Sequence, residues 1–331
     1  MSTAVAADVR VYLFTYRRNH LLPRALSSLL AQTHTNWVCE LHNDDPDDLF
    51  PGQLVAETND PRITYVRHER NLGPTATFNH AFRPVRESFV SLLEDDNWWE
   101  PTMLARLLAA IRQHPRINVA WVNSHLWRET SSGEWERAGT IWPVEGEPIT
   151  IFDRPDPIQA CRAIHSHGAM VLRVTRETMV PCPASMPIVA IEPIRERAYP
   201  GRLLLIREPL ANFAITLHSW RSETADENMQ MLVLLAMTFM ATSPNTEDFY
   251  ARMWDLCRGD RGHKHRVLVV AGIKSGRLFS VIRGAAVTDL VLVAGWALLH
   301  PRRFVNLFAA ARRFPDVYAF LAAPGRNQAT H

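Results

Sequence analysis

The sequence has too few cysteines for a disulfide framework. Its 331 residues include four, and these stand far apart without any Cys-x-x-Cys pair: Cys39, Cys161, Cys182 and Cys257. We interpret them as reduced thiols of a cytoplasmic protein and not as a disulfide scaffold or a zinc site. An excess of one charge is also missing, because the formal net charge is +2. Overall charge therefore gives no reason to expect nucleic-acid binding.

Long apolar runs are absent as well. The first residues contain no basic stretch followed by a long apolar core, so we expect no secretory signal. The most apolar later window, residues 285–299, is interrupted by Asp289. It is shorter than the roughly 20 residues that a spanning helix needs. We expect no spanning helix, while a helix lying on a membrane surface remains open.

The first 125 residues alternate between short apolar runs typical of strands and segments with helical apolar spacing. The expected strands are 9–15, 37–41, 63–66 and 89–93, and the expected helices are 21–30, 75–82 and 101–111. Asn19 is the expected cap of the first helix. This alternation with short links predicts an α/β fold with a doubly wound, mostly parallel sheet.

The rest of the chain divides into a β-rich and a helical part. A strand and hairpin are expected over 119–151, a strand over 165–173, a helix over 191–198 and two short strands over 203–206 and 211–216. Helices are then expected over 228–240, 247–256, 266–277, 281–299 and 301–313. From residue 250 on, about 13 Lys and Arg face about four acids. The basic helices could be solvated faces, or could attach to anionic lipid or a partner.

Polar clusters follow three of the expected strands. Thr15, residues 43–45 and the run Glu94, Asp95 and Asp96 each come directly after an apolar run. In doubly wound sheets, ligands bind at the carboxyl ends of the strands. Adjacent carboxylates suit a hard divalent cation, Mg²⁺ or Mn²⁺, together with the phosphates of a substrate. An acidic loop that only precedes the next helix is the alternative.

Three stretches resemble family-two glycosyltransferases of the GT-A fold. They are "VRVYLFTYRRNHLLPRALSSLLAQTHTNWVCELHNDDPDD", "RITYVRHERNLGPTATFNHAF" and "SLLEDDNWWEP", and they cover about residues 8–115 in the family's order and spacing. The resemblance implies an inverting, metal-dependent transferase that uses a nucleotide-diphosphate sugar, with UDP the family's commonest nucleotide. It also implies a GT-A domain over 1–222, with a nucleotide-sugar half (1–118) and an acceptor half (119–222). A helical region, 223–331, follows.

The resemblance also assigns roles to individual residues. The nucleotide pocket would be lined by Thr15, Tyr16, Arg18, Asn43, Asp44, Arg70, Asn71, Gly73 and Asn79. Glu94 and Asp96 would be the two ends of the metal motif, with Asp95 between them facing the donor sugar. Two positions depart from the family's pattern, because Glu94 stands where Asp is usual and Asn43 where Asp is more frequent.

The acceptor half resembles the family more weakly. Glu192, in "PIVAIEPIRERAYPGRLLLI", is the expected general base, although Pro193 follows it where the family often has Asp. Asp95 and Glu196 are its rivals. His167, Gly168 and Ala169 would border the acceptor, with His165 on the same strand face as His167. His218 would help to hold the metal or the diphosphate.

Two other functions remain open at this level. A sugar nucleotidyltransferase would also place carboxylates on such a sheet, but it usually has a glycine-rich basic loop where this chain has "FTYRRNHLLP". A catalytically degenerate nucleotide- or sugar-binding protein of the same fold is the second alternative. The acceptor could be a surface or lipid-linked glycan or a secondary metabolite. The basic helices would allow contact with the inner face of the membrane, or a homodimer.

Overall fold

The computed structural model describes residues 7–217, 225–258 and 264–322. Two compact units make up the chain. The first consists of Met1–Asp153, His165–Ala184 and Tyr199–Trp220, and the second of Arg154–Ile164, Ser185–Ala198 and Arg221–His331. Two segments that precede residue 222 thus group with the C-terminal helices. The expected domain limits at residues 118 and 222 stay predictions.

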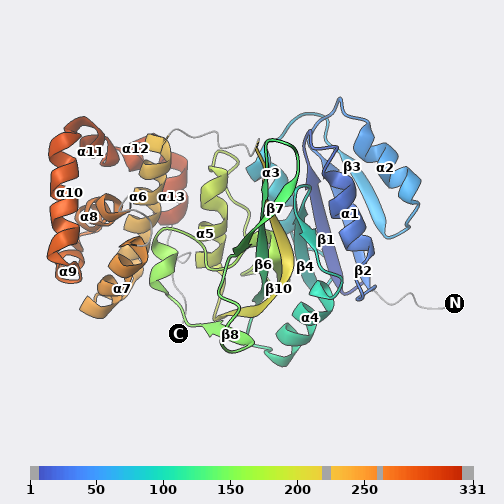
Figure 1. Ribbon diagram of the computed structural model, residues 1–331, viewed down its shortest axis with the longest axis horizontal. Coiled ribbons are helices and arrows are strands. Elements are labelled where there is room, and N and C mark those ends of the chain that lie inside the picture. Colours follow the sequence, from blue (N-terminus) through green and yellow to red (C-terminus); the bar gives the residue numbers. More distant parts are fainter. Residues whose placement is uncertain (1–6, 218–224, 259–263, 323–331) are drawn as a thin grey trace. The chain divides into compact units, whose positions relative to one another are not determined.

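The first unit is built on a mixed sheet that has ten strands over the described residues (Figure 1). They are β1 (Val9–Thr15), β2 (Trp37–Asn43), β3 (Ile63–Arg67), β4 (Phe89–Glu94), β5 (Trp98–Trp99), β6 (Val119–Glu129), β7 (Trp135–Thr140), β8 (Ile149–Phe152), β9 (Met170–Arg173) and β10 (Leu203–Ile215). The main order is β3-β2-β1-β4-β9-β6-β10-β5. The strands β3, β2, β1 and β4 are mutually parallel, as are β6 and β10. The expected mostly parallel α/β sheet is confirmed.

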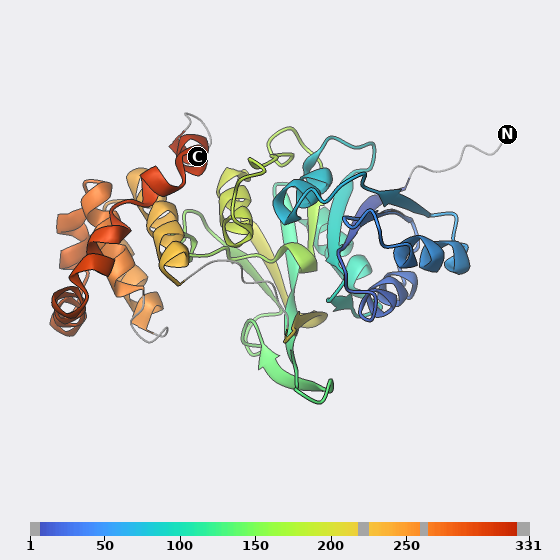
Figure 2. The ribbon, with the colours of Figure 1, turned by 90° about the horizontal axis from the view of Figure 1, so that it is seen from above.

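Helices cover both faces of this sheet. They are α1 (Leu22–Leu30), α2 (Phe50–Thr58), α3 (Pro74–Phe78), η1 (Asn79–Phe82), α4 (Met103–Gln113) and η3 (His167–Ala169). The apolar sides of α1 and α4 share one core with Val11 and Leu13 of β1. Because side chains alternate along a strand, Tyr12 and Phe14 face the other way, where Phe14 meets Phe78 of α3. Figure 2 shows α1 and α3 on opposite sides of the sheet.

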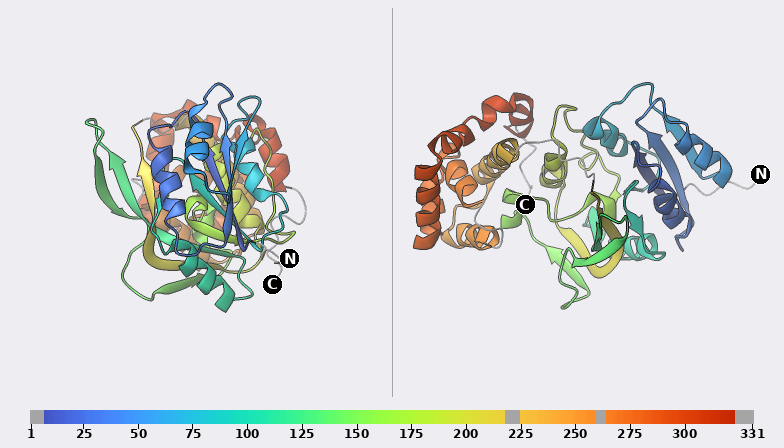
Figure 3. Two further views of the ribbon diagram at one scale, coloured as in Figure 1. Left: turned by 90° about the vertical axis from the view of Figure 1, so that its right-hand side faces the viewer. Right: turned by 45° about the horizontal axis from the view of Figure 1, so that its top comes forward.

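The second unit is helical over its described residues. It contains η2 (Pro157–Ala160), α5 (Ile188–Ala198), α6 (Ala225–Thr242), α7 (Glu247–Arg258), α8 (His265–Lys274), α9 (Leu278–Arg283), α10 (Val287–Leu299), α11 (Pro301–Leu307), α12 (Ala310–Arg313) and α13 (Pro315–Ala322). Helix α6 packs on α8, and α10 packs on α8 and α11 (Figure 3). Across the described parts of the chain, we find no helix with the length and apolar character needed to cross a membrane.

Several local expectations were wrong. Helix α1 begins after Leu21 without a side-chain cap, and Asn19 instead donates to Asp48. The two short strands expected after residue 203 are one strand, β10, whose register shifts around Pro209. The long helix expected over 281–299 is broken at Gly284, where a Cβ atom would lie 2.6 Å from the backbone nitrogen of Ala251.

Candidate active site

The parallel register brings the polar clusters to one edge of the sheet. Thr15 pairs with Asn43 across β1 and β2, and Phe14 pairs with Glu94 across β1 and β4. The pairing continues past the strand ends, because the amide of Asp95 donates to the carbonyl of Phe14 over 3.1 Å. The carboxyl ends of β1, β2 and β4 therefore lie side by side, as the sequence predicted.

Two acids at this edge are buried around one arginine. Asp95 is 4% exposed and Asp96 is 8% exposed. Arg18 donates to Asp95 Oδ1 over 3.3 Å and forms an ion pair with Asp96. Asp95 Oδ2 also accepts from the backbone amide of Tyr16 over 3.1 Å. The turn that follows β1 is thus attached to the acidic run that follows β4.

Burial dominates the electrostatics of these acids. The pKa of Asp95 is raised to about 7, first by burial and then by the neighbouring charge of Asp96, while Arg18 opposes the rise. Burial also raises the pKa of Asp96, against Arg18. One guanidinium therefore does not fully compensate two buried carboxylates. Another cation beside them would lower the free energy of both ionised groups.

Glu94 is held by its own loop. Asn97 donates to Glu94 Oε2 over 2.5 Å and accepts the amide of Ala214 over 3.0 Å. A Cβ atom on Gly168 would lie 3.5 Å from the same Glu94 oxygen, which is an ordinary van der Waals distance, so the backbone of η3 lies close to the acid. Trp99 Nε1 donates to the carbonyl of Gly168 over 2.8 Å and fixes that approach. The structure therefore brings Gly168 next to the acidic run.

The expectation for the residues before β9 needs correction. His167, Gly168 and Ala169 form the short helix η3, and the strand begins only at Met170. His165 and His167 are therefore not on a strand, although their rings lie 5.2 Å apart. All three η3 residues are buried. A role for them beside an acceptor stays a prediction.

Asn43 and Asp44 point into the protein and make structural hydrogen bonds. Asn43 is 0% exposed, donates to the carbonyl of Asp48 and to the hydroxyl of Tyr65, and accepts the amide of Asp45. Asp44 accepts from the amides of residues 72 and 73 and from His68. These two side chains therefore stabilise the loops that follow β2 and β3 in this structure. Direct contact with a base or ribose stays a prediction.

The segment between β3 and α3 is organised by Asp44. Gly73 has φ +80°, a conformation that favours glycine, and its amide lies 3.0 Å from Asp44 Oδ2 and 2.8 Å from Asn71 Oδ1. Arg70 and Asn71 are exposed at this edge. Asn79 lies further on, where its amide pairs in both directions with the backbone of Cys182. These contacts give Asn79 a structural role.

The expected base and its rivals differ in surroundings. Glu192 lies half-buried on α5, in the second unit. Glu196 is 0% exposed and accepts from Gln159 Nε2 over 2.7 Å and from the amide of Ile164 over 2.8 Å. These bonds attach η2 to α5 and argue against Glu196 as a base. His218 lies outside the described residues.

Sequence reasoning missed one cation beside the acids. Arg24 of α1 donates to the backbone carbonyl of Asp96 over 2.9 Å. Its guanidinium lies 3.7 Å from the ring centre of Trp98 and 4.6 Å from that of Trp135. Trp98 thus packs on an arginine in this structure. No signal pointed to Arg24, because its partners come from β5 and β7, far away in the sequence.

Comparison with known proteins shows which family this part of the chain matches. The family model described as glycosyl transferase family 2 matches residues 11–167, which include β1 to β4 and the acidic run. The chain carries a glycosyl transferase family 2 domain. The family-two resemblance of the sequence is thereby confirmed.

Relatives of the family 2 domain are named glycosyltransferases. The putative colanic acid biosynthesis glycosyl transferase WcaA of Escherichia coli K12 is 32% identical over 106 residues, which are 32% of this chain and 38% of WcaA. The UDP-Glc:alpha-D-GlcNAc-diphosphoundecaprenol beta-1,3-glucosyltransferase WfgD of Escherichia coli is 29% identical over 91 residues, 28% of this chain and 36% of WfgD. The match thus spans little more than a third of these relatives.

Solved structures show the same fold. S. aureus TarS 1-349 in complex with UDP-GlcNAc matches with a TM-score of 0.61 and 14% identity, over 93% of this chain and 91% of that chain. The mannosyltransferase PcManGT of Pyrobaculum calidifontis, in complex with GDP-Man and Mn²⁺, matches with a TM-score of 0.52 and 12% identity, over 94% and 87%. At these identities the likeness supports the GT-A fold.

The acidic run fits a divalent cation. Asp95 and Asp96 offer buried oxygen ligands whose charge Arg18 alone leaves undercompensated, and Glu94 adds a carboxylate at the end of β4. Mg²⁺ and Mn²⁺ prefer such oxygen ligands. A cation here has to share Asp96 with Arg18 or displace it.

We predict that the buried Asp95 makes a contribution to the stability of the metal-free protein that falls as pH rises. The folded protein favours protonated Asp95, whose pKa is about 7 against 3.8 in the unfolded chain. The folded state is therefore progressively disfavoured from about pH 4 to pH 7. Asp95→Asn should raise the free energy of unfolding at pH 8 by on the order of 1–3 kcal/mol. Urea unfolding at pH 5 and pH 8, with Glu57→Ala on the exposed side of α2 as control, measures this. An equal pH dependence in wild type and Asp95→Asn contradicts it.

Proposed function

We propose that the protein is an inverting, metal-dependent glycosyltransferase. It moves a sugar from a nucleotide-diphosphate donor to an acceptor hydroxyl. The observation that carries this proposal is the cluster of Asp95, Asp96 and Arg18 at the carboxyl edge of a family 2 domain. Relatives support it, since WfgD is named a UDP-Glc-dependent glucosyltransferase and TarS is described with UDP-GlcNAc.

Each part of the cluster has a task in this reaction. Glu94 and Asp96 would hold Mg²⁺ or Mn²⁺, and the ion would neutralise charge on the leaving diphosphate. Asp95 faces the donor sugar. Its carboxylate also accepts the backbone amide of Tyr16 and so keeps the turn after β1 in place. Arg18, the cation paired with Asp95 and Asp96, would also neutralise charge on the diphosphate. Thr15, Arg70 and Asn71 border the nucleotide at the same edge.

The general base is Glu192 in this proposal. A single displacement with inversion needs a base that takes the proton of the acceptor hydroxyl. Glu192 is partly exposed on α5, whereas Glu196 is enclosed by hydrogen bonds within its own unit. The donor is expected to carry UDP, with GDP and dTDP as the other candidates. The acceptor is a surface or lipid-linked glycan or a secondary metabolite.

Donor binding tests the acid cluster. Calorimetric titration of UDP, GDP and dTDP in Mn²⁺ should show binding of one nucleotide that EDTA removes. Asp96→Ala should lose this metal-dependent binding, because one end of the metal motif is gone, while far-ultraviolet circular dichroism stays unchanged. Glu57→Ala, exposed on α2, is the matched control. Unchanged nucleotide affinity in Asp96→Ala would refute the metal assignment, and no binding of any of the three would favour a degenerate relative.

Transfer kinetics test the base. Glu192→Gln removes the proton acceptor with little change in shape, so kcat should fall by about 100-fold or more while the KM for the donor stays the same. Glu177→Gln, an exposed acid of the first unit, should keep wild-type kinetics. A kcat of Glu192→Gln close to that of wild type would leave Asp95 as the base. An altered donor KM with an unchanged kcat would place Glu192 in donor binding.

We further propose that α10 rests on an anionic lipid surface. Val287, Val291 and Leu298 form a stripe along this helix and are 78%, 63% and 82% exposed. Arg302 and Arg303 follow on α11 and are exposed. Apolar side chains beside basic ones match the chemistry of an anionic membrane interface. A cytoplasmic location at the inner face of the membrane would agree with this attachment and stays a prediction.

Vesicle flotation measures this attachment. The protein should float with phosphatidylglycerol-containing vesicles and not with pure phosphatidylcholine, and Leu298→Glu should abolish flotation. Val144→Glu, an exposed apolar position of the first unit, is the control. If wild type is instead a dimer by light scattering and Leu298→Glu is a monomer, a second copy covers the stripe and the lipid proposal fails.

A further inference from the structure

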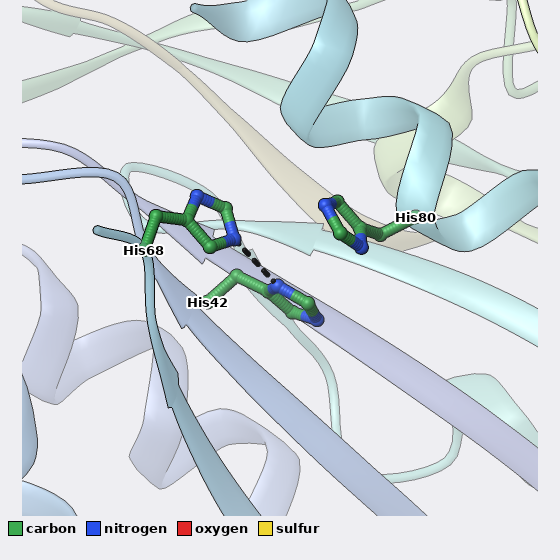
Figure 4. A group of neighbouring side chains, drawn as sticks. All are labelled: His42, His68 and His80. Atoms are coloured by element: carbon green, nitrogen blue, oxygen red, sulfur yellow. Dashed lines mark hydrogen bonds between the residues drawn. The ribbon is translucent and has the colours of Figure 1, made fainter. Parts of the chain in front are cut away.

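Three histidines lie together on the sheet face that carries α3 and η1. His42 belongs to β2, His68 follows β3 and His80 belongs to η1 (Figure 4). One ring nitrogen from each lies within 4.8 Å of the other two. His42 and His68 are 1% and 7% exposed, and His80 is half-buried. This histidine cluster lies within the first unit and is made of nitrogen ligands, unlike the acidic run.

The row of hydrogen bonds that runs through His42 and His68 has one proton fewer than it has links when both rings are neutral. Glu40, His42, His68 and Asp44 form a row with links of 3.1, 3.0 and 2.9 Å. Carboxylates only accept, and two neutral imidazoles carry two N–H protons for three links. If both protons point to the carboxylates, His42 Nδ1 and His68 Nε2 face one another as lone pairs. A positive charge between them removes the repulsion.

The carboxylate partners of His42 and His68 are of the kind that metal-binding histidines have. A ligating imidazole usually donates its second ring nitrogen to a carboxylate, which fixes the tautomer and makes the inner nitrogen more basic. His42 has Glu40 in that place and His68 has Asp44. The pKa of Glu40 is lowered, first by its hydrogen bond with His42. Both inner nitrogens are thereby prepared as lone-pair ligands.

His80 can supply the third ligand. Its ring centre lies 4.6 Å from that of His42 and 5.2 Å from that of His68. It lines an open cavity of about 410 Å³ together with Glu40 and Tyr12, and this cavity gives an ion a way in. Three positive side chains, Arg10, Arg83 and Arg86, border the cavity as well. Arg10 is paired with Glu40 and Glu87, so its charge is already compensated.

We propose that His42, His68 and His80 bind one zinc ion, with water as the fourth ligand. Imidazole suits zinc, whereas Mg²⁺ and Mn²⁺ prefer oxygen. Nitrogens at zinc–nitrogen distances of 2.0–2.1 Å in a tetrahedron are about 3.3 Å apart. His42 and His68 are already at 3.0 Å, and His80 closes the set by moving toward them.

The ion has a structural consequence for the neighbouring loop. His68 is bonded to Asp44, and the same carboxylate accepts the amides of Leu72 and Gly73. Zinc on His68 strengthens the row through Asp44 and so orders the segment before α3. The site does not depend on the proposed transfer reaction, and its test is independent of any donor or acceptor.

The test measures metal binding by protein without a polyhistidine tag. After treatment with a chelator, wild type should take up one zinc per chain and gain in melting temperature. Co²⁺ in its place should give the visible absorption bands of a tetrahedral site. His80→Gln should lose the zinc, the bands and the gain in melting temperature, and its half-buried position makes it the least disruptive change. His114→Gln, at the end of α4, should behave like wild type.

The acidic run is the internal comparison. Asp96→Ala should keep the full zinc stoichiometry, because the histidine cluster shares no ligand with it. Three results would overturn the proposal. They are no zinc bound by wild type, equal zinc binding by wild type and His80→Gln, or loss of the zinc in Asp96→Ala. If wild type binds no zinc, the charge between His42 and His68 is a shared proton. If Asp96→Ala loses the zinc, the ion lies on the acidic run.

Discussion

The parallel pairing of β1 with β2 and β4 is the constraint on which the rest of the candidate site depends. It ends three strands at one edge and continues beyond them, since the amides of Asp44 and Asp95 donate to the carbonyls of Thr15 and Phe14. Buried carboxylates repel each other, so the edge is stable only with cations among them. Arg18 serves that purpose for Asp95 and Asp96 in the ligand-free chain.

The same pairing also divides the site chemically. Odd-numbered side chains of β1 pack on α1 and α4, whereas Tyr12 and Phe14 face α3 and η1. Carboxylates gather beyond the strand ends, and imidazoles gather on the second face, where His42 follows the alternation of β2. One register therefore separates the acidic run from the histidine cluster.

Much of this fold could be predicted, because buried strands are apolar runs and amphipathic helices have a clear period. The strand Val9–Thr15 was expected with its observed bounds. Helix α2 was missed because Pro51 and Gly52 stand in its first turn, after an acid-rich stretch of sequence. The break at Gly284 was missed because it depends on close contact with α7, a tertiary effect. Sequence periodicity contains no information on such contacts.

The acidic run could be predicted from the sequence, whereas the histidine cluster could not. The acidic run is contiguous, so its place after a strand was visible in the sequence. The histidine cluster is not, because positions 42, 68 and 80 have no fixed motif spacing and meet only through the register of β2 with β3 and the turn of η1. Asp44 connects the parts: it was expected as a nucleotide contact, yet its oxygens bind His68 and the amides of Leu72 and Gly73. Asp44 thus joins the histidine cluster to the segment before α3, at the edge of the sheet where the family's sequence pattern predicts a nucleotide contact.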